Sequence, residues 1–300
     1  MDEIRRAAQL IRAGQLVAFP TETVYGLGAN ALDADAVRRI YEAKGRPFTS
    51  PLIVHVSSPE MARGLAAAWP EAAERLTARW WPGPLTVVVR KQPVIPDLVT
   101  AGLPTVGLRM PSHPMALDLI REAGVPIAGP SANRFSEISP TTADHVRSSL
   151  GDRVAMILDG GPCTIGIEST VISVAGDRPV LLRPGIIPLS ELEPWDEFVR
   201  QGPADPAPGL AVRHYSPRTP LRLGLPPFTG RGAYLYWNQP AAAANLVPMP
   251  HDPAGYAAAL YDVLHQLDKQ GWDWIAVEPV PPGGEWAGIR DRLQRAAASG

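Results

Sequence analysis

The chain has 300 residues, of which 45% are hydrophobic and 19% are charged, and its formal net charge is −2. A chain of this length is expected to form one large domain or two domains of moderate size. The net charge excludes an overall electrostatic attraction of the protein to nucleic acid or to an anionic membrane. Cys163 is the only cysteine, which excludes an internal disulfide and a cysteine-built zinc site. The first residues lack the apolar core of a signal peptide, and no apolar run reaches the roughly 18 residues of a membrane span. We expect a cytoplasmic protein without membrane contact.

Residues 1–200 alternate between short apolar runs and helical patterns. A helix over residues 4–11 is predicted to end at Gly14, and a helix capped by Asp33 is predicted to end at Gly45 and Pro47. Further strands are predicted at residues 16–19, 52–56, 85–89, 126–128, 154–158, 170–174 and 180–182 and near Val106. One further helix is predicted to begin at Ser58-Pro59, and two others are predicted near residues 114–123 and 142–150. The mixed order of these elements predicts an α/β fold with a mixed sheet flanked by helices.

A proline-rich segment follows this region and separates it from a second pattern of strands and helices. Such a segment is extended and semi-rigid, as expected of a connector. Beyond it, strands are predicted at residues 233–237 and 274–277 and helices at 254–269 and 286–298. We therefore divide the chain into an α/β domain at residues 1–201, a connector at 202–220 and a small C-terminal α/β domain of Rossmann-like type at 221–300.

Four cations lie on loops or strand ends without an acidic residue nearby in the sequence. They are Lys44, Arg46, Arg109 and Arg183. Cations in such places are candidates to bind an anionic ligand. Each one alone is also explained by a solvated surface charge, and Lys44 by the last carbonyls of its helix.

Three loops at strand ends are rich in small hydroxyl residues, namely residues 20–28, 129–133 and 167–171. Strand ends are where α/β proteins bind ligands, and hydroxyls beside glycines suit phosphate and carboxylate oxygens, although the same residues are common in turns. A phosphate-binding P-loop is absent from the sequence, and Gly26 and Gly28 match the dinucleotide pattern only loosely. The six histidines show no metal-binding spacing.

Seven segments together resemble the YrdC-like domain of threonylcarbamoyl-AMP synthases, in the same order along the chain. They are residues 20–28, 44–47, 51–55, 82–86, 130–133, 166–171 and 182–185. His214-Tyr215-Ser216-Pro217 resembles the connector of the two-domain form of this family. The resemblance covers about residues 10–190 and implies a YrdC-like twisted mixed sheet flanked by helices.

The resemblance also implies an activity, with ATP, L-threonine and bicarbonate as substrates and Mg²⁺ accompanying ATP. The products would be pyrophosphate and threonylcarbamoyl-AMP, which supplies the tRNA threonylcarbamoyl-transfer machinery that modifies adenosine 37; direct nucleic acid binding is expected to be weak or absent. Carried over position by position, the catalytic residues around the ATP phosphates are Lys44, Arg46, Ser131 and Asn133, the threonine site is Thr23, His55, Arg109, Gly129 and Ser169, and the further ATP contacts are Ser50, Thr105, Ser139, Arg183 and Tyr215. No side chain is assigned to a metal.

Two positions depart from the family pattern, and two other functions compete with this one. Ser50 stands where family members often have Asn, which predicts a weaker ATP contact, and Gly129 stands where they often have Ala. An RNA-binding module would also need a cationic surface, but the net charge of −2 and the absence of basic runs disfavour it. A carbamoyl-transfer maturation factor would share the domain, but the chain lacks Cys-rich and acylphosphatase-like segments.

Overall fold

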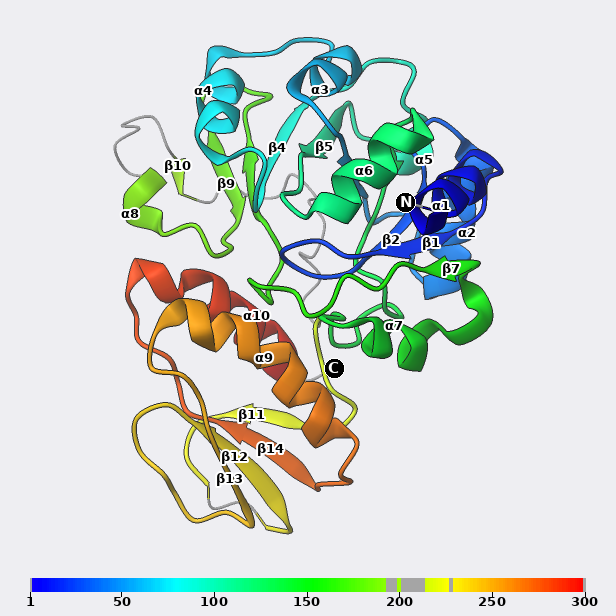
Figure 1. Ribbon diagram of the computed structural model, residues 1–300. Coiled ribbons are helices and arrows are strands. Elements are labelled where there is room, and N and C mark those ends of the chain that lie inside the picture. Colours follow the sequence, from blue (N-terminus) through cyan, green and yellow to red (C-terminus); the bar gives the residue numbers. More distant parts are fainter. Residues whose placement is uncertain (1, 193–198, 201–213, 227–228, 299–300) are drawn as a thin grey trace.

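The computed structural model describes residues 2–192, 199–200, 214–226 and 229–298. Its strands form two sheets, one of ten strands and one of four. In Figure 1 the larger sheet and its helices occupy the upper part of the molecule and the smaller sheet the lower part, with helices α9 (Pro253–Asp268) and α10 (Ala287–Ala297) between them. The predicted α/β fold with a second, small α/β domain is confirmed.

The larger sheet is mixed, with the strand order β10-β9-β8-β4-β5-β3-β6-β2-β1-β7. Its strands are β1 (Val17–Phe19), β2 (Gly26–Asn30), β3 (Ile53–His55), β4 (Leu85–Arg90), β5 (Thr105–Arg109), β6 (Ile127–Ala128), β7 (Met156–Ile157), β8 (Thr170–Ser173), β9 (Val180–Arg183) and β10 (Val199–Arg200). Val87 and Val88 of β4 point to opposite faces of the sheet, and both are buried. Both faces of the central strands are therefore covered.

The helices that cover this sheet follow the predicted pattern in most places. They are α1 (Asp2–Arg12), α2 (Ala34–Lys44), α3 (Pro59–Leu65), α4 (Glu71–Trp80), α5 (Asp97–Thr100), α6 (Pro114–Ala123), α7 (Ala143–Leu150), the 3₁₀ helix η1 (Gly151–Arg153) and α8 (Leu189–Leu192). The Asp33 side chain caps α2 by accepting from two backbone amides, and Gly45 ends the helix at φ 63°. Arg46 leaves α2 on the loop that follows, which carries it toward the strand ends.

Strand β2 was not among the predicted elements, because its residues lie within a hydroxyl-rich loop sequence. It pairs antiparallel with β1, so the chain makes a hairpin here and not the strand–turn–helix unit of a dinucleotide site. A Cβ atom on Gly26 would lie 2.8 Å from the ring of Phe19, and one on Gly28 would lie 3.0 Å from it. These glycines therefore make room for the Phe19 ring, which explains the loose dinucleotide pattern.

The smaller sheet has the strand order β11-β14-β12-β13, and all its strands are parallel. They are β11 (Leu221–Leu223), β12 (Gly232–Tyr236), β13 (Asn245–Pro248) and β14 (Trp274–Val277), and the 3₁₀ helix η2 (Gly284–Trp286) precedes α10. Residues 202–213 of the predicted connector lie outside the described residues. Among the helices that are described, none is long and apolar enough to cross a membrane.

Candidate active site

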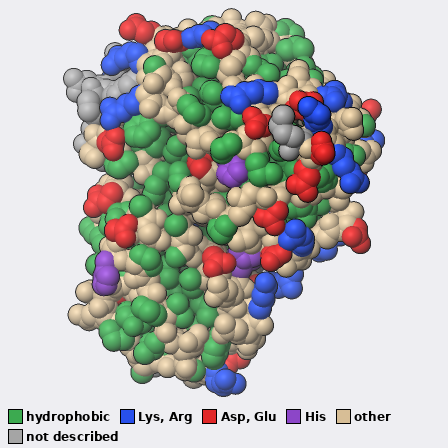
Figure 2. Space-filling model, in the orientation of Figure 1, with side chains coloured by type: hydrophobic (Ala, Val, Ile, Leu, Met, Phe, Trp, Pro, Cys, Tyr) green, Lys and Arg blue, Asp and Glu red, His purple; other side chains and the backbone are tan. Residues whose placement is uncertain are grey.

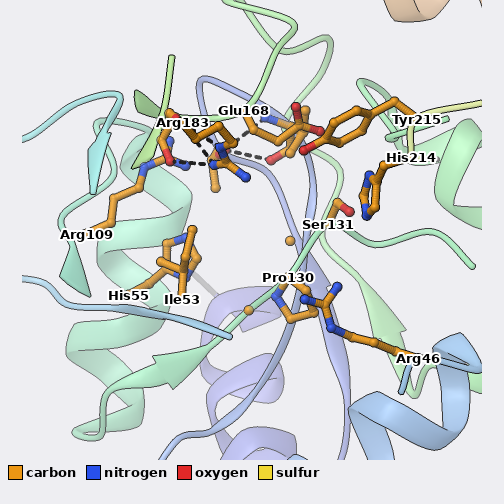
Figure 3. A pocket seen from close by; sticks show the side chains of 15 residues that line it. Arg46, Ile53, His55, Arg109, Pro130, Ser131, Glu168, Arg183, His214 and Tyr215 are labelled. Atoms are coloured by element: carbon orange, nitrogen blue, oxygen red, sulfur yellow. Dashed lines mark hydrogen bonds between the residues drawn. The ribbon is translucent and has the colours of Figure 1, made fainter. Parts of the chain in front are cut away.

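A cleft lies where several strands of the larger sheet end. His55 ends β3 and Arg109 ends β5, and the two residues are neighbours because these strands are parallel and in register. Figure 3 shows His55 and Arg109 on one side of the cleft and His214 and Tyr215, which belong to the connector, on the other. The empty volume is about 530 Å³, including the open mouth. The lining residues are Thr21, Val24, Gly26, Arg46, Ile53, His55, Arg109, Gly129, Pro130, Ser131, Glu168, Ser169, Arg183, His214 and Tyr215.

Arg46 and Lys44 lie close in sequence but have different surroundings. Arg46 lines the cleft, and its Nη2 donates to Oγ of Ser50 at 2.5 Å, so Ser50 orients the guanidinium. Burial lowers the pKa of Arg46 to about 10, which leaves it charged at neutral pH. The Nζ of Lys44 instead donates to the carbonyl of Ser131 at 2.5 Å and to that of Asn133. Lys44 therefore holds the loop that forms one wall of the cleft.

Arg109 has an acidic partner, which corrects the prediction from sequence. Its Nη2 donates to Oε1 of Glu22 at 2.7 Å, and both side chains are buried. The prediction was wrong because it considered only acids near Arg109 in the chain, whereas Glu22 comes from the loop after β1. Burial by itself raises the pKa of Glu22, but the charge and hydrogen bond of Arg109 outweigh this and lower the pKa. Glu22 is thus an anion that Arg109 neutralises.

Arg183 and Ser169 reach the cleft as one hydrogen-bonded unit. The Nε and Nη2 of Arg183 donate to the carbonyl of Ser169 at 3.1 and 2.9 Å, and Nη2 also donates to its Oγ at 3.1 Å. The same Oγ lies 2.8 Å from Oγ1 of Thr86, which fixes the hydroxyl on its other side. Glu168, which directly precedes Ser169 in the chain, also lines the cleft and is absent from the predicted site. An acid inside a hydroxyl-rich loop is the sequence signal that could have revealed both Glu22 and Glu168.

Two predicted contacts lie off the wall of the cleft. Oγ1 of Thr23 lies 2.9 Å from Oγ1 of Thr21, and Thr21 is the residue that faces the cleft. Thr105 begins β5 whereas Arg109 ends it. At about 3.3 Å per residue, Thr105 is roughly 13 Å along the strand from the cleft. The structure therefore builds this side of the cleft from Thr21 and Arg109, without the side chains of Thr23 and Thr105.

Asn133 and Ser139 support the wall from behind. The side-chain amide of Asn133 donates to the carbonyls of Arg134 at 2.8 Å and Glu137 at 2.9 Å, which closes the turn after Ser131. Oγ of Ser139 donates to Oε1 of Glu168 at 2.5 Å. Both residues are buried, so they shape the loops that reach the cleft.

Three polar groups on the cleft wall have no hydrogen-bond partner among the described residues. They are Nδ1 of His55, Nδ1 of His214 and the hydroxyl of Tyr215. A buried polar group without a partner costs free energy, so each is a candidate to bond a ligand. A Cβ atom on Gly129 would lie 3.2 Å from Nδ1 of His55, so the departure from Ala at this position leaves space beside that nitrogen. Tyr215 has φ 62°, a left-handed conformation that few non-glycine residues adopt.

The buried histidines predict that the protein loses stability in mild acid. Burial lowers the pKa of His55 and His214 to about 3 and that of His145 and His265 to about 4. Between pH 6.5 and these values the unfolded chain binds protons that the folded chain does not. The free energy of unfolding is therefore expected to fall by up to about 1.4 kcal/mol per histidine for each pH unit below 6.5.

Urea denaturation at pH 7 and pH 5 measures this dependence. His145 and His265 stack at 3.8 Å between their ring centroids, one from each domain. The variant H145F/H265F keeps two stacked rings that do not titrate, so we expect it to lose about half of the dependence. Equal unfolding free energies for the parent protein at the two pH values would contradict the assignment.

The described residues offer no group of three or more His, Cys, Asp or Glu side chains that could hold a metal ion. Glu168 on the cleft wall is paired with Arg292, and Glu22, behind Arg109, is paired with Arg109. Neither carboxylate is available to a cation without breaking such a pair.

Comparison with known proteins agrees with the fold. Residues 9–185 match the Sua5/YciO/YrdC family model, described as telomere recombination, and residues 187–298 match the model for the C-terminal domain of threonylcarbamoyl-AMP synthase. The threonylcarbamoyl-AMP synthase of Bacillus subtilis (strain 168) is 44% identical over 98% of this chain and 93% of its own length. The crystal structure of P. abyssi Sua5 complexed with L-threonine matches with a TM-score of 0.92 and 41% identity, over 98% of this chain and 94% of that one.

A further relative matches about half of this chain. The threonylcarbamoyl-AMP synthase of Halorhodospira halophila (strain DSM 244 / SL1) is 37% identical over 52% of this chain and 82% of its own length. Fold, cleft and comparisons define a two-domain α/β protein whose larger domain is of the Sua5/YciO/YrdC class. The chain belongs to the threonylcarbamoyl-AMP synthase family, in the form that carries the additional C-terminal domain.

Proposed function

We propose that this protein is an L-threonylcarbamoyladenylate synthase, which forms threonylcarbamoyl-AMP and pyrophosphate from L-threonine, bicarbonate and ATP. One observation carries the proposal: three arginines line the same cleft as three polar groups that have no hydrogen-bond partner among the described residues. Guanidinium groups bind carboxylates and phosphates, often through two parallel hydrogen bonds. Family membership and the threonine-bound structure of P. abyssi Sua5 support the same function.

The chemistry requires two anions to meet. The amine of threonine first attacks the carbon of bicarbonate, the C–OH bond breaks and water leaves; an oxygen of the resulting carbamate then attacks the α-phosphorus of ATP. The bond from that phosphorus to the bridging oxygen breaks, and pyrophosphate leaves with the electron pair. Arg46 and Arg183 are buried on the cleft wall and would neutralise the phosphates as charge develops. Ser131, on the loop that Lys44 holds, lies on the same wall.

The threonine end of the cleft is proposed to lie beside His55 and Arg109. The guanidinium of Arg109 donates from Nη2 to Glu22 and from Nε to the carbonyl of Gly83 at 3.3 Å, and its Nη1 is proposed to bind the threonine carboxylate. His55 is neutral at pH 7, because burial lowers its pKa to about 3, so its free Nδ1 would meet a hydroxyl or amine without a charge. Ser169 and Thr21 would complete this end.

A reconstitution assay tests the function. Purified protein is mixed with ATP, Mg²⁺, bicarbonate and threonine, and both pyrophosphate and threonylcarbamoyl-AMP are measured. The expected result is that each product forms only when every substrate is present. Pyrophosphate release in the absence of threonine, at the rate of the complete mixture, would instead indicate hydrolysis of ATP and refute the proposal.

The connector is proposed to close the cleft over the reactive intermediate. Tyr215 is 1% exposed, and its ring covers one side of the cleft (Figure 3). We expect Tyr215→Ala to admit water, which lowers the yield of threonylcarbamoyl-AMP relative to pyrophosphate. Tyr236→Ala, on the small sheet, is the control and should keep the parent ratio. An unchanged rate and ratio in Tyr215→Ala would remove this role.

The proposal also covers the downstream partners of the protein, the metal ion that accompanies ATP and the cellular compartment. The adenylate is proposed to pass to the tRNA threonylcarbamoyl-transfer machinery in the cytoplasm, and Mg²⁺ is proposed to enter with the ATP phosphates. On the face in Figure 2, Lys and Arg side chains alternate with Asp and Glu and form no extended cationic patch. This supports weak or no direct nucleic acid binding, for which a salt titration of tRNA affinity is the test.

A further inference from the structure

The C-terminal domain packs directly against two loops of the active site. A Cβ atom on Gly166 would lie 2.3 Å from the carbonyl oxygen of Ala257 in α9, and one on Gly288 in α10 would lie 2.2 Å from that of Gly185. Backbone therefore meets backbone at both places. The first loop continues into Glu168 and Ser169, and the second follows Arg183, so the domain rests on the segments that carry part of the cleft wall.

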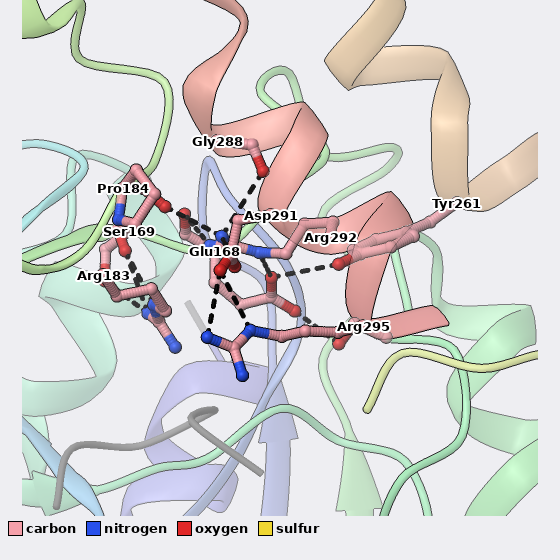
Figure 4. A network of polar contacts seen from close by, with 10 residues as sticks. Glu168, Ser169, Arg183, Pro184, Tyr261, Gly288, Asp291, Arg292 and Arg295 are labelled. Atoms are coloured by element: carbon pink, nitrogen blue, oxygen red, sulfur yellow. Dashed lines mark hydrogen bonds and ion pairs between the residues drawn. The ribbon is translucent and has the colours of Figure 1, made fainter. Parts of the chain in front are cut away.

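One side chain of α10 connects both loops. Arg292 is 1% exposed, and Figure 4 shows it beside Glu168 and Pro184. Its Nε donates to Oε2 of Glu168 at 2.7 Å, its Nη2 donates to the Glu168 carbonyl at 3.0 Å, and its Nη1 donates to the carbonyl of Pro184 at 2.8 Å. The guanidinium also lies 5.3 Å from the ring centroid of Tyr215. Arg292 thus contacts both loops and the connector at once.

The charge of Glu168 makes this contact important for the cleft. Glu168 lines a cleft that is proposed to receive triphosphate and carbamate, and an unneutralised carboxylate there would repel both. Oγ of Ser139 and the hydroxyl of Tyr261 donate to it at 2.5 and 3.1 Å, but neither carries a charge. Asp291 also pairs with Arg292, at 2.8 Å, and has Arg295 as a second partner at 3.0 Å. Without Arg292, Glu168 would lose the charged group to which it is hydrogen-bonded.

We propose that Arg292 is a positioning residue of the active site: supplied by the C-terminal domain, it neutralises Glu168 on the cleft wall and so keeps this carboxylate from repelling the phosphates of the nucleotide. The inference rests on the proposed function, and it assigns the C-terminal domain a part in substrate binding.

The test compares R292M, E168Q and the double variant E168Q/R292M in the full chain. For R292M we expect the KM for ATP to rise at least about 10-fold, with a smaller change in kcat, because a buried charge loses its partner. In the double variant residue 168 is neutral and needs no counterion, so its KM should lie within about twofold of that of E168Q. The control is R290M: Arg290 is on the same helix but donates only to the Pro281 carbonyl of its own domain at 2.7 Å.

Two outcomes would overturn the proposal. One is a folded R292M whose KM for ATP stays within twofold of the parent value. The other is a double variant whose KM exceeds that of E168Q by about 10-fold, because Arg292 would then act without regard to the charge of residue 168. If R292M does not fold, the KM values for ATP of E168Q and of the double variant are sufficient to test the proposal. Both variants are expected to fold, since neither buries an unpaired carboxylate at position 168.

Failure of the proposed function is distinguished by measuring nucleotide binding directly. The dissociation constant of ATP is determined by calorimetry for the same four variants and the parent protein. If the parent binds ATP but forms no threonylcarbamoyl-AMP, the proposed function fails while the affinities still test Arg292. If the parent forms the adenylate and R292M binds ATP as tightly as the parent, the role of Arg292 fails and the function stands.

Discussion

Replacing Arg46 by alanine is expected to lower the rate of pyrophosphate formation about 10²–10³-fold, which is the cost typical of losing one group that stabilises charge in a transition state. Arg46 is 7% exposed, so its charge acts through little solvent. Arg46→Lys should recover only part of this loss, because an ammonium group cannot bond both Ser50 and a phosphate in the fixed geometry of a guanidinium. Initial rates at saturating threonine and bicarbonate measure the effect.

Arg38→Ala is the matched control for Arg46. Arg38 is on the same helix, its side chain is 50% exposed, and it pairs only with Asp35 one turn away. Its removal is expected to leave the rate within twofold of the parent value, because exposed pairs of this kind contribute little. A loss of less than about fivefold in Arg46→Ala would show that the phosphates are neutralised elsewhere.

Lys44→Met is expected to lower the same rate at least about 10²-fold, and to lower the free energy of unfolding by about 2–4 kcal/mol as well. Lys44 is buried, and burial lowers its pKa well below the ordinary value. Methionine has a similar shape but cannot donate to the carbonyls of Ser131 and Asn133, so two buried acceptors lose their partner. The loop that carries Ser131 should then move more.

Hydrogen exchange distinguishes the effect of Lys44→Met from that of Arg46→Ala. Lys44→Met should speed the exchange of backbone amides in residues 129–135, whereas Arg46→Ala should leave them protected, because the Lys44 ammonium donates to two carbonyls of that loop and the Arg46 guanidinium donates to Ser50 and Pro51 instead. Lys91→Met is the control: Lys91 pairs with Asp97 at 2.8 Å and does not line the cleft. Unchanged exchange of this loop in Lys44→Met, together with a large loss of rate, would place Lys44 at the phosphates instead of behind the loop.

The sequence by itself was enough for the α/β class and for most helices. Helix α2 is an example, because Asp33 and Gly45 act on backbone groups within a few residues of themselves. It was also enough to indicate which loops form the cleft: Arg46, His55, Ser131 and Ser169 lie together as the order of motifs predicted. Caps, turns and motifs act over short stretches of chain, so they are readable without a fold.

Only the tertiary structure decided how the charges are paired and where the long side chains point. Glu22 is 87 residues from Arg109, and Glu168 is 124 residues from Arg292, yet both pairs are buried contacts at 2.7 Å. Whether Lys44 faces a ligand or a loop carbonyl depends on the packing around it, and its sequence neighbours do not determine this. A buried ion pairs with an opposite charge that lies within a few ångströms of it. Which residue lies that close is known only from the folded structure, because the partner can be far away in the sequence.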